Sequence, residues 1–300
     1  MSELTRDYAK LHFIVFLWGF TAILGKLITI PSVELVFYRV LIASVALAVL
    51  LKFRNRSFNL GVKDIAKITG TGLIIAAHWI LFFASVKVST VSVCLAGMAT
   101  ATLFTSILEP IFNKRPVRIY EVILGLTVIV GLYIIFRFTV NQTLGLILAL
   151  ASAFLAALFT VINARFTKRH NPYMITFYEM SGATVGIALF FPVYTTYFTN
   201  GALDLTPSAL DWFYIAIIAL VCTVYAYSIS VELMKRLTAF AVNLTINLEP
   251  VYGIVLAVLI LNEDERMNTG FYVGTMVILL SVLAYPLMNR WRRRRAMKNV

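Results

Sequence analysis

The sequence consists mainly of apolar segments of about 20 residues that are separated by short polar connections. A transmembrane helix needs about this length, because the hydrocarbon core of a bilayer is roughly 30 Å thick and a helix rises about 1.5 Å per residue. Hydrophobic residues make up 60% of the chain and charged residues only 13%. A soluble globule of this size cannot bury so much apolar side chain, so we expect an all-α polytopic membrane protein.

Ten apolar segments can be counted along the 300 residues. The two longest connections, residues 52–64 and 198–209, cannot hold a soluble domain, so any function must reside among the helices. The approximate limits of the ten segments are residues 11–30, 33–51, 65–86, 90–112, 117–136, 142–164, 172–197, 210–233, 238–261 and 269–289.

The basic residues indicate how these segments are oriented. If the N-terminus is cytoplasmic, 21 Lys and Arg residues lie on the cytoplasmic side and three on the other side, while Lys26 and Arg39 lie within segments. The cytoplasmic connections of membrane proteins carry such an excess of Lys and Arg. A missed segment would invert every later connection and destroy the asymmetry. We therefore expect ten transmembrane helices in a cell (inner) membrane, with both termini cytoplasmic.

The same basic connections explain the net charge of +12, so no nucleic-acid partner is expected. The two cysteines, Cys94 and Cys222, lie in apolar segments and form no metal-like cluster. The three histidines are scattered, and the zinc-protease, phosphate-loop and serine-hydrolase motifs are all absent from the sequence. We expect no metal, no cofactor and no catalytic residue, which argues against an enzyme.

The chain contains an internal repeat. Residues 89–101 resemble residues 238–250 at an offset of 149, and residues 37–39 resemble residues 177–179 at an offset of 140. We therefore divide the chain into residues 1–140 and 141–300, with five helices in each. Because five is odd, the second repeat crosses the membrane in the inverted sense. Inverted repeats can exchange roles around a site near the midplane, which favours a carrier.

Four groups of residues form a pattern that extends over the whole chain. They are Trp18-Gly19 with Lys26, Phe37-Tyr38-Arg39 followed by Ala43, Leu248-Glu249-Pro250 followed by Asn262-Glu263, and the glycine pairs Gly125 with Gly131 and Gly270 with Gly274. This pattern resembles the EamA family of drug/metabolite transporters. The resemblance implies ten helices around a central polar cavity. It also implies export or exchange of amino acids, related metabolites or amphipathic drugs across a plasma membrane.

Two positions in the first half depart from the family pattern. Ala101 stands where the resemblance implies a proline in the fourth segment, and Lys114 stands where it implies a glutamate. The fourth segment instead carries Glu109-Pro110 nearer its cytoplasmic end. We therefore expect the two halves to be hinged unequally.

Charged residues inside the segments are candidates for the site, because a charge at the bilayer centre costs at least about 2.5–3.5 kcal/mol on insertion scales. Arg39 lies seven residues into the second segment, where it either fixes helix packing through an internal pair or faces a cavity and binds a carboxylate. Lys26 lies near the end of the first segment, where it either pairs with Glu34 across the turn or faces the cavity.

Two carboxylates have similar alternatives. Glu179 is the repeat counterpart of Arg39 and has the opposite sign. One hypothesis places Arg39 at the carboxylate end and Glu179 at the amine end of a zwitterionic solute, and the other pairs Glu179 with a neighbouring helix. Glu249 precedes Pro250 in mid-segment, where proline disturbs the helix. That pair suits a gate, a proton site or an amine contact, with a packed kink as the alternative.

The remaining candidates for the cavity are aromatic and amide side chains, for which ordinary helix packing is the alternative. His78 could also carry protons, since an unperturbed histidine titrates near pH 6.5. The glycine pairs allow close helix contact, either within a monomer or across a homodimer. The candidates are Tyr38, His78, Trp79, Asn163, Tyr178, Tyr225, Tyr227, Asn243 and Asn247.

Together these features predict a secondary transporter that exports or exchanges amino acids or related small metabolites by alternating access. Its expected partners are the lipid bilayer and a small-molecule solute. A channel-like facilitator would share the polar path, but the inverted repeat counts against it. A membrane-embedded enzyme would need a catalytic constellation that the sequence does not display.

Overall fold

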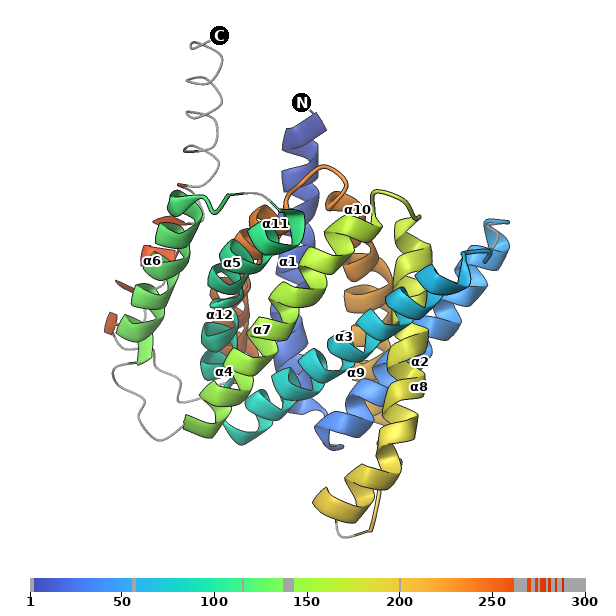
Figure 1. Cartoon of the computed structure of the whole chain (residues 1–300). Helices are drawn as coiled ribbons and strands as arrows, with labels where there is room; N and C mark the ends of the chain where they lie inside the picture. The colour runs from blue at the N-terminus through green and yellow to red at the C-terminus, as the bar shows by residue number, and fades with distance from the viewer. Residues whose placement is uncertain are drawn as a thin grey trace.

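The computed structural model describes residues 3–55, 58–114, 116–136, 143–199 and 201–261, and the short pieces 269–270, 273–274, 276–278, 280–281, 284 and 288. The described residues contain helices and connections but no strand, in agreement with the predicted all-α class (Figure 1).

Six helices precede residue 140. Two of them, α4 and α5, follow each other within one apolar segment, Val91–Asn113. The six helices are α1 (Glu3–Leu27), α2 (Ser32–Phe53), α3 (Val62–Val88), α4 (Val91–Met98), α5 (Ala101–Asn113) and α6 (Ile119–Phe136).

The second half is also helical as far as residue 261. Its third apolar segment, Ala209–Leu233, is continuous but contains a π-helical stretch, a rare geometry that often marks functional sites. The elements are α7 (Thr143–Phe166), α8 (Pro172–Phe198), α9 (Ala209–Ile217), the π-helix η2 (Ile218–Tyr227), α10 (Ser228–Leu233), α11 (Ala239–Ile246) and α12 (Glu249–Leu261).

Seven segments of the described chain are long and apolar enough to cross a membrane, which supports a multi-pass protein. The predicted count of ten is not confirmed. The apolar part of α6, Ile119–Gly131, is short, and the predicted segment 238–261 is divided between α11 and α12. Much of the predicted segment 269–289 lies outside the described residues. The seven segments are Glu3–Leu27, Ser32–Phe53, Val62–Val88, Val91–Asn113, Thr143–Phe166, Pro172–Phe198 and Ala209–Leu233.

The outer surface of the bundle is rich in apolar side chains. Leu189 on α8 and Ile119 on α6 are each 74% exposed, and Leu259 on α12 is 71% exposed. In water such a surface would promote aggregation, whereas lipid tails solvate it without cost. The exposed apolar surface is therefore consistent with a protein that lies in a bilayer.

Local sequence explains where several helices begin. Asn171 accepts a hydrogen bond from the backbone N–H of Tyr173 and starts α8, with Pro172 in the first turn. Ser208 and Asp211 form a reciprocal capping box at the start of α9. These caps satisfy backbone donors that a helix terminus leaves unpaired.

Two helix breaks occur at positions 148 residues apart, within one residue of the offset of 149 that the sequence repeat shows. One separates α4 from α5 at Ala99–Thr100, and the other separates α11 from α12 at Asn247–Leu248. Pro250 accounts for the second break, because it occupies the first turn of α12, where its missing N–H costs little. The first break forms without a proline, and the hydroxyl of Thr100 donates to the carbonyl of Gly97, 2.7 Å away. We expected Ala101 to make the two halves hinge unequally, but both halves contain a helix break at this position.

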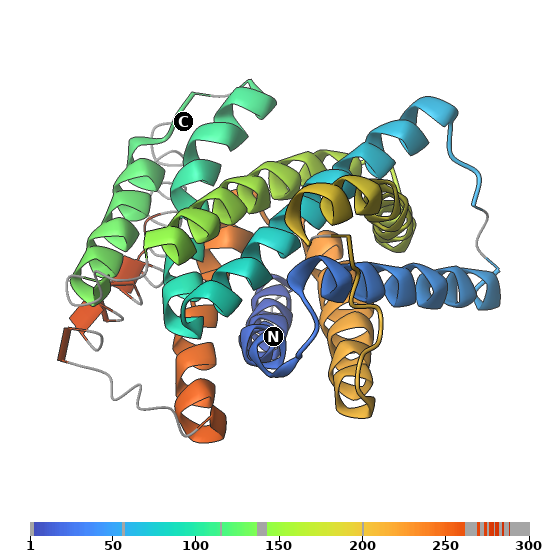
Figure 2. The same ribbon diagram turned by 90° about the horizontal axis from the view of Figure 1, so that it is seen from below.

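Helix α3 lies at the centre of the bundle, between α7 and α8, while α2 packs on α8 and α1 packs on α12 (Figures 1 and 2). The contact of α3 with α8 is close because both helices present glycine. A Cβ added to Gly72 would collide with the carbonyl oxygen of Glu179, and one added to Gly182 would collide with that of Thr69.

Gly131 on α6 and Gly274 in the predicted segment 269–289 also approach each other within one chain. A Cβ added to Gly131 would lie 2.8 Å from the carbonyl oxygen of Gly274. Close helix contact within the monomer is thus seen at these two glycines, while the homodimer stays a prediction.

Candidate functional site

A cavity of about 90 Å³ lies inside the bundle. Helices α1 to α5 of the first half of the chain contribute side chains to its wall, and so do α7, η2, α10, α11 and α12 of the second half. Seven of the residues that the sequence indicated contribute to this wall. They are Arg39, His78, Trp79, Tyr227, Asn243, Asn247 and Glu249.

Arg39 is 2% exposed and stands in this wall. Its Nε donates to the hydroxyl of Thr223, 2.8 Å away, and its guanidinium carbon lies 3.7 Å from the centroid of the Trp79 ring. Among the described residues its Nη1 has no hydrogen-bond partner. The guanidinium is thus held by one hydrogen bond and by cation–π contacts with Trp79 and, at 5.8 Å, with Phe83, and it has a donor left over inside the protein.

The π-helix positions the partner of Arg39. The hydroxyl of Thr223 donates to the carbonyl of Ile218, five residues earlier, at 3.0 Å. The same hydroxyl oxygen accepts from Arg39. The wider turn of η2 therefore provides the acceptor that orients the buried guanidinium.

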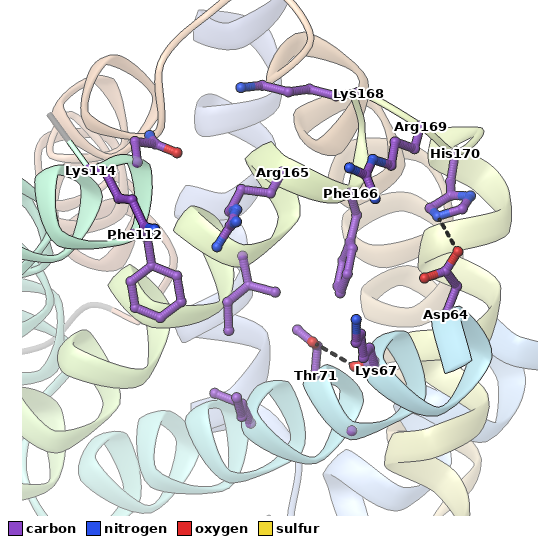
Figure 3. Close-up of a pocket in the computed structure, with 14 residues that line it drawn as sticks. Asp64, Lys67, Thr71, Phe112, Lys114, Arg165, Phe166, Lys168, Arg169 and His170 are labelled. Carbon is purple, nitrogen blue, oxygen red and sulfur yellow. Dashed lines mark hydrogen bonds and ion pairs between the residues drawn. The ribbon is translucent and has the colours of Figure 1, made fainter. Parts of the chain in front are cut away.

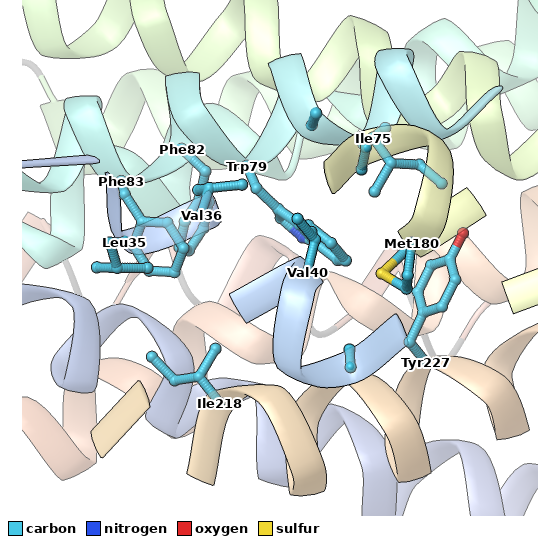
Figure 4. Close-up of a cluster of buried hydrophobic side chains, with 14 of the residues drawn as sticks. Leu35, Val36, Val40, Ile75, Trp79, Phe82, Phe83, Met180, Ile218 and Tyr227 are labelled. Carbon is cyan, nitrogen blue, oxygen red and sulfur yellow. The ribbon is translucent and has the colours of Figure 1, made fainter. Parts of the chain in front are cut away.

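The aromatic core beside the cavity keeps this site away from water. Trp79 and Phe83 on α3 flank Arg39, and Val36 and Val40 of α2 lie against them (Figure 4). The ring centroid of Tyr227 lies 5.9 Å from that of Trp79. In these surroundings, hydrogen bonds to a charged group are stronger than in solvent.

His78 is anchored to α7. Its Nδ1 lies 2.8 Å from the hydroxyl oxygen of Ser152 and 3.0 Å from the carbonyl oxygen of the same residue. The Ser152 hydroxyl also donates to the carbonyl of His78 at 2.9 Å. These contacts give His78 a packing role in the wall, while its proposed role in carrying protons stays a prediction.

Tyr227 belongs to a buried network behind the wall. Its hydroxyl donates to Oε2 of Glu179 at 3.1 Å and accepts from Nδ2 of Asn163 at 2.8 Å. Glu179 and Asn163 are fully buried, and only Tyr227 of the three lines the cavity. The carboxylate in the wall is Glu249. In the hypothesis of a zwitterionic solute between Arg39 and a carboxylate, Glu249 therefore takes the place of Glu179 at the amine end.

Asn243 and Asn247 connect the two halves of the chain. The amide nitrogen of Asn243 donates to the hydroxyl of Thr105 at 2.6 Å, and that of Asn247 donates to the hydroxyl of Thr102 at 2.8 Å. Both acceptors belong to α5, directly after the first helix break. The two amides therefore line the cavity and also hold the broken segments of the two halves together.

The match to a known protein family extends over both halves of the chain. The profile of the EamA-like transporter family matches residues 11–137 and again residues 143–285, which together make up most of the chain. The chain belongs to the EamA-like transporter family. It is therefore a membrane transporter of the drug/metabolite type. The sequence resemblance to this family is confirmed.

One solved structure, described only as the crystal structure of a protein, matches this transporter with a TM-score of 0.71 and 14% sequence identity. The match covers 93% of this chain and 96% of that chain. At this level of identity the likeness shows a shared fold. The curated proteins contain no match.

Besides Asn163 and Glu179, four residues that the sequence assigned to the cavity of the transporter lie elsewhere. Lys26 donates to the carbonyl oxygens of Val86 and Ser89, at 3.3 and 3.1 Å, and does not pair with Glu34. Glu34 instead accepts from the backbone N–H of Asp204 at 3.4 Å. The ammonium group of Lys26 therefore satisfies carbonyls near the end of α3.

Three tyrosines are also outside the cavity wall. The hydroxyl of Tyr38 donates to the carbonyl of Leu205, and that of Tyr178 donates to the carbonyl of Phe58. Tyr225 is 45% exposed on the outer surface. Tyr38 and Tyr225 lie on elements that do contribute a wall residue, Arg39 on α2 and Tyr227 on η2, whereas α8, which carries Tyr178, contributes none.

Several residues of the transporter in or beside the cavity wall were not anticipated. The most informative is Thr223, which does not line the cavity itself but holds Arg39. Thr21, Thr160, Phe82 and Phe159 line the cavity. Threonine satisfies its hydroxyl within its own helix and is common in membrane helices, so the sequence alone offered no signal for these positions.

Metal binding has no support in the described part of the chain. It contains no group of three or more His, Cys, Asp or Glu side chains that could hold a metal ion. The wall of the cavity offers amides, hydroxyls, one carboxylate and one guanidinium instead. This donor set suits an organic solute with polar ends.

A second and larger cavity, of about 750 Å³, opens at one end of the bundle. Its lining comes from the start of α3 and from the ends of α5 and α7. The N-terminus of α1 lies at the same end, and the connection from α8 to α9 lies at the opposite end (Figure 1). We call this second cavity the basic vestibule, because its lining includes Lys67, Lys114, Arg165, Lys168 and Arg169.

Proposed function

We propose that this chain is a secondary transporter that exports or exchanges amino acids or related small metabolites across the plasma membrane by alternating access. The observation that carries the proposal is Arg39, a buried guanidinium with a donor that has no partner among the described residues. Burying a charge without full pairing is costly, and function is the usual reason for retaining one inside a membrane protein.

The chemistry of the cavity supports a small solute with an acidic group. A guanidinium binds carboxylates through parallel hydrogen bonds, and Arg39 has Nη1 available for one. Glu249, 8% exposed, lines the same cavity and could accept from an amine. Drug-sized ligands need roughly 300–1,000 Å³. The central cavity of about 90 Å³ therefore favours a small solute or an occluded arrangement of the helices.

Different closure at the two ends supports alternating access. At the end away from the N-terminus, Asp211 accepts from the backbone N–H and the hydroxyl of Thr29, at 2.8 and 2.7 Å. Tyr38 also bonds to Leu205 there. At the N-terminal end the basic vestibule is open. A carrier needs two such states of similar energy around one site.

The proposal includes ten helices in two inverted repeats, residues 1–140 and 141–300, with both termini in the cytoplasm. The double match to the family and the two helix breaks separated by 148 residues support the repeats. The excess of basic residues on one side supports the orientation. A homodimer stays an expectation.

Exchange in proteoliposomes tests the proposal. Vesicles that contain the purified chain are preloaded with unlabelled amino acids and supplied with labelled ones, with and without a pH gradient. We expect saturable uptake that internal solute accelerates. Uptake without that acceleration would indicate a channel-like facilitator, and a chemically altered solute would indicate an enzyme. The same assay with organic acids follows if amino acids give no flux.

A further inference from the structure

The basic vestibule concentrates cations around a hollow. Its lining includes five Lys and Arg side chains, from α3, from α7 and from the turns that follow α5 and α7, and the one acidic side chain in the lining is Asp64. Asp64 already has a partner, since its Oδ2 lies 3.3 Å from Nε2 of His170. All five cations are exposed. Within the described part of the chain, none of the five side chains makes a hydrogen bond or ion pair.

Orientation in the membrane does not by itself account for this arrangement. Positive-inside orientation requires cations on one side, but it does not require them to surround a cavity of about 750 Å³. Arg165 extends from α7 toward α3, and Lys67 extends from α3 toward α7 (Figure 3). Five like charges around one opening repel each other, and a bound anion would relieve that repulsion.

The vestibule also has apolar walls. Phe112 stands on the α5 side and Phe166 on the α7 side, and Ile74 and Ile162 complete the lining (Figure 3). Inorganic ions gain nothing from such contacts. An anion with a carbon skeleton would bury apolar surface against the phenylalanine rings while its charged group meets the cations.

The vestibule leads toward the central cavity along two helices. On α3, Thr71 and Ile74 line the vestibule, and His78 lines the central cavity one helical turn further on. On α7, Ile162 lines the vestibule and Phe159 lines the central cavity. A ligand in the vestibule is therefore on the path to Arg39.

We propose that the basic vestibule binds a soluble organic anion, with a phosphate or carboxylate head and an apolar body, as the first station of the transported solute. This inference rests on the proposed function and narrows its substrate class to anionic metabolites. Clustered cations focus the field in a cleft and raise the local concentration of anions, so the vestibule would also speed capture from the cytoplasm.

Calorimetric binding of phenyl phosphate tests the site without requiring transport. The full chain is placed in phosphatidylcholine nanodiscs at pH 7.5 and constant ionic strength, where a phosphate monoester is mostly a dianion because its second pKa is about 6. We expect saturable binding, with a lower Kd than for inorganic phosphate. The triple variant K67Q/R165Q/R169Q should raise the Kd at least about tenfold.

The matched control is K10Q/K63Q/K235Q, which removes three exposed cations from the same end but outside the vestibule. It should change the Kd by less than about twofold, because exposed distant charges are screened. Equal weakening in both triple variants would overturn the proposal, since it would show a general field and no site. If the vestibule triple variant does not fold, R165Q alone takes its place, with an expected increase of about threefold.

Two further binding experiments identify the kind of ligand. F112A should reduce the preference for phenyl phosphate over inorganic phosphate, and an unchanged preference would contradict an apolar body. Replacing one third of the lipid with phosphatidylglycerol should leave the Kd nearly unchanged. A large increase would show that lipid headgroups occupy the vestibule and would overturn the soluble-ligand proposal. Binding without transport would contradict the proposed function and leave the site intact, whereas transport without binding would contradict the site alone.

Discussion

The guanidinium carbon of Arg39 lies 3.7 Å above the ring of Trp79, within the wall of the central cavity. A cation–π contact in a desolvated site stabilises by about 2 kcal/mol, which offsets only part of the cost of burying the charge. The hydrogen bond to Thr223 offsets a further part. The remaining cost is best explained by an anionic group that occupies the free side of the guanidinium during transport.

Arg39→Lys should lower transport kcat/KM at least about tenfold. Lysine keeps the positive charge but loses the planar group that stacks on Trp79 and the Nε–H that bonds to Thr223. Initial rates in proteoliposomes, with thermal stability measured in parallel, check this expectation. Thr223→Ser is the control, because it keeps the hydroxyl and should change kcat/KM less than about threefold. Full activity of Arg39→Lys would show that Arg39 is only a packing element.

Glu249→Gln should separate recognition from stability. Glutamine has the same shape and no charge, so removing this buried carboxylate should leave the melting temperature unchanged or higher. We expect KM to rise at least about tenfold for solutes that carry an amine and to change less for solutes that lack one. Competition assays with matched pairs of solutes measure the difference. An equal effect on both classes would argue that Glu249 acts in gating or coupling.

Thr29→Val should favour opening of the end of the bundle away from the N-terminus. It removes the hydroxyl bond to Asp211 but leaves the capping box of α9 intact. Loss of one hydrogen bond of about 1 kcal/mol changes the ratio of open to closed states about fivefold. The rate at which a maleimide labels the buried Cys222, in a Cys94→Ala background, reports the open state. Thr206→Val removes a hydroxyl bond to Asp204 within the same connection, so its labelling rate should match that of the unmutated background.

Gly72→Ala should destabilise the protein by about 1–3 kcal/mol, because the new methyl group meets the backbone of Glu179 on α8 and neither helix can yield locally. Gly70→Ala is the matched control, two residues away on the same helix, where an added Cβ has no atom within 4 Å. It should be neutral or stabilising, since alanine favours a helix by about 1 kcal/mol over glycine. Melting temperatures in detergent check both variants. Similar melting temperatures would mean that α3 and α8 can separate without cost.

The sequence was most informative about the cavity wall where a single residue carries the signal. Arg39 and Glu249 were recognisable because a charge in an apolar segment needs a reason wherever the helix faces, and both lie in the cavity wall. The sequence could not tell which of Tyr225 and Tyr227 faces the cavity, because they lie only two residues apart in one apolar segment. The structure places Tyr225 on the outer surface and Tyr227 in the wall, at 45% and 4% exposure.

The sequence by itself determined the all-α membrane class of the protein and its family. These properties can be predicted from sequence because the hydrocarbon of the bilayer requires long apolar segments, in which isolated charges stand out. Only the tertiary structure decided which carboxylate shares the cavity with Arg39, placing Glu249 in the wall and Glu179 behind Tyr227. It also brought the cations of α3, of α7 and of the turns after α5 and α7 around one opening. These outcomes depend on how each helix is rotated and on contacts between residues far apart in the chain, and the π-helical turn at Ile218–Tyr227 alters that rotation in a way that no hydropathy pattern shows.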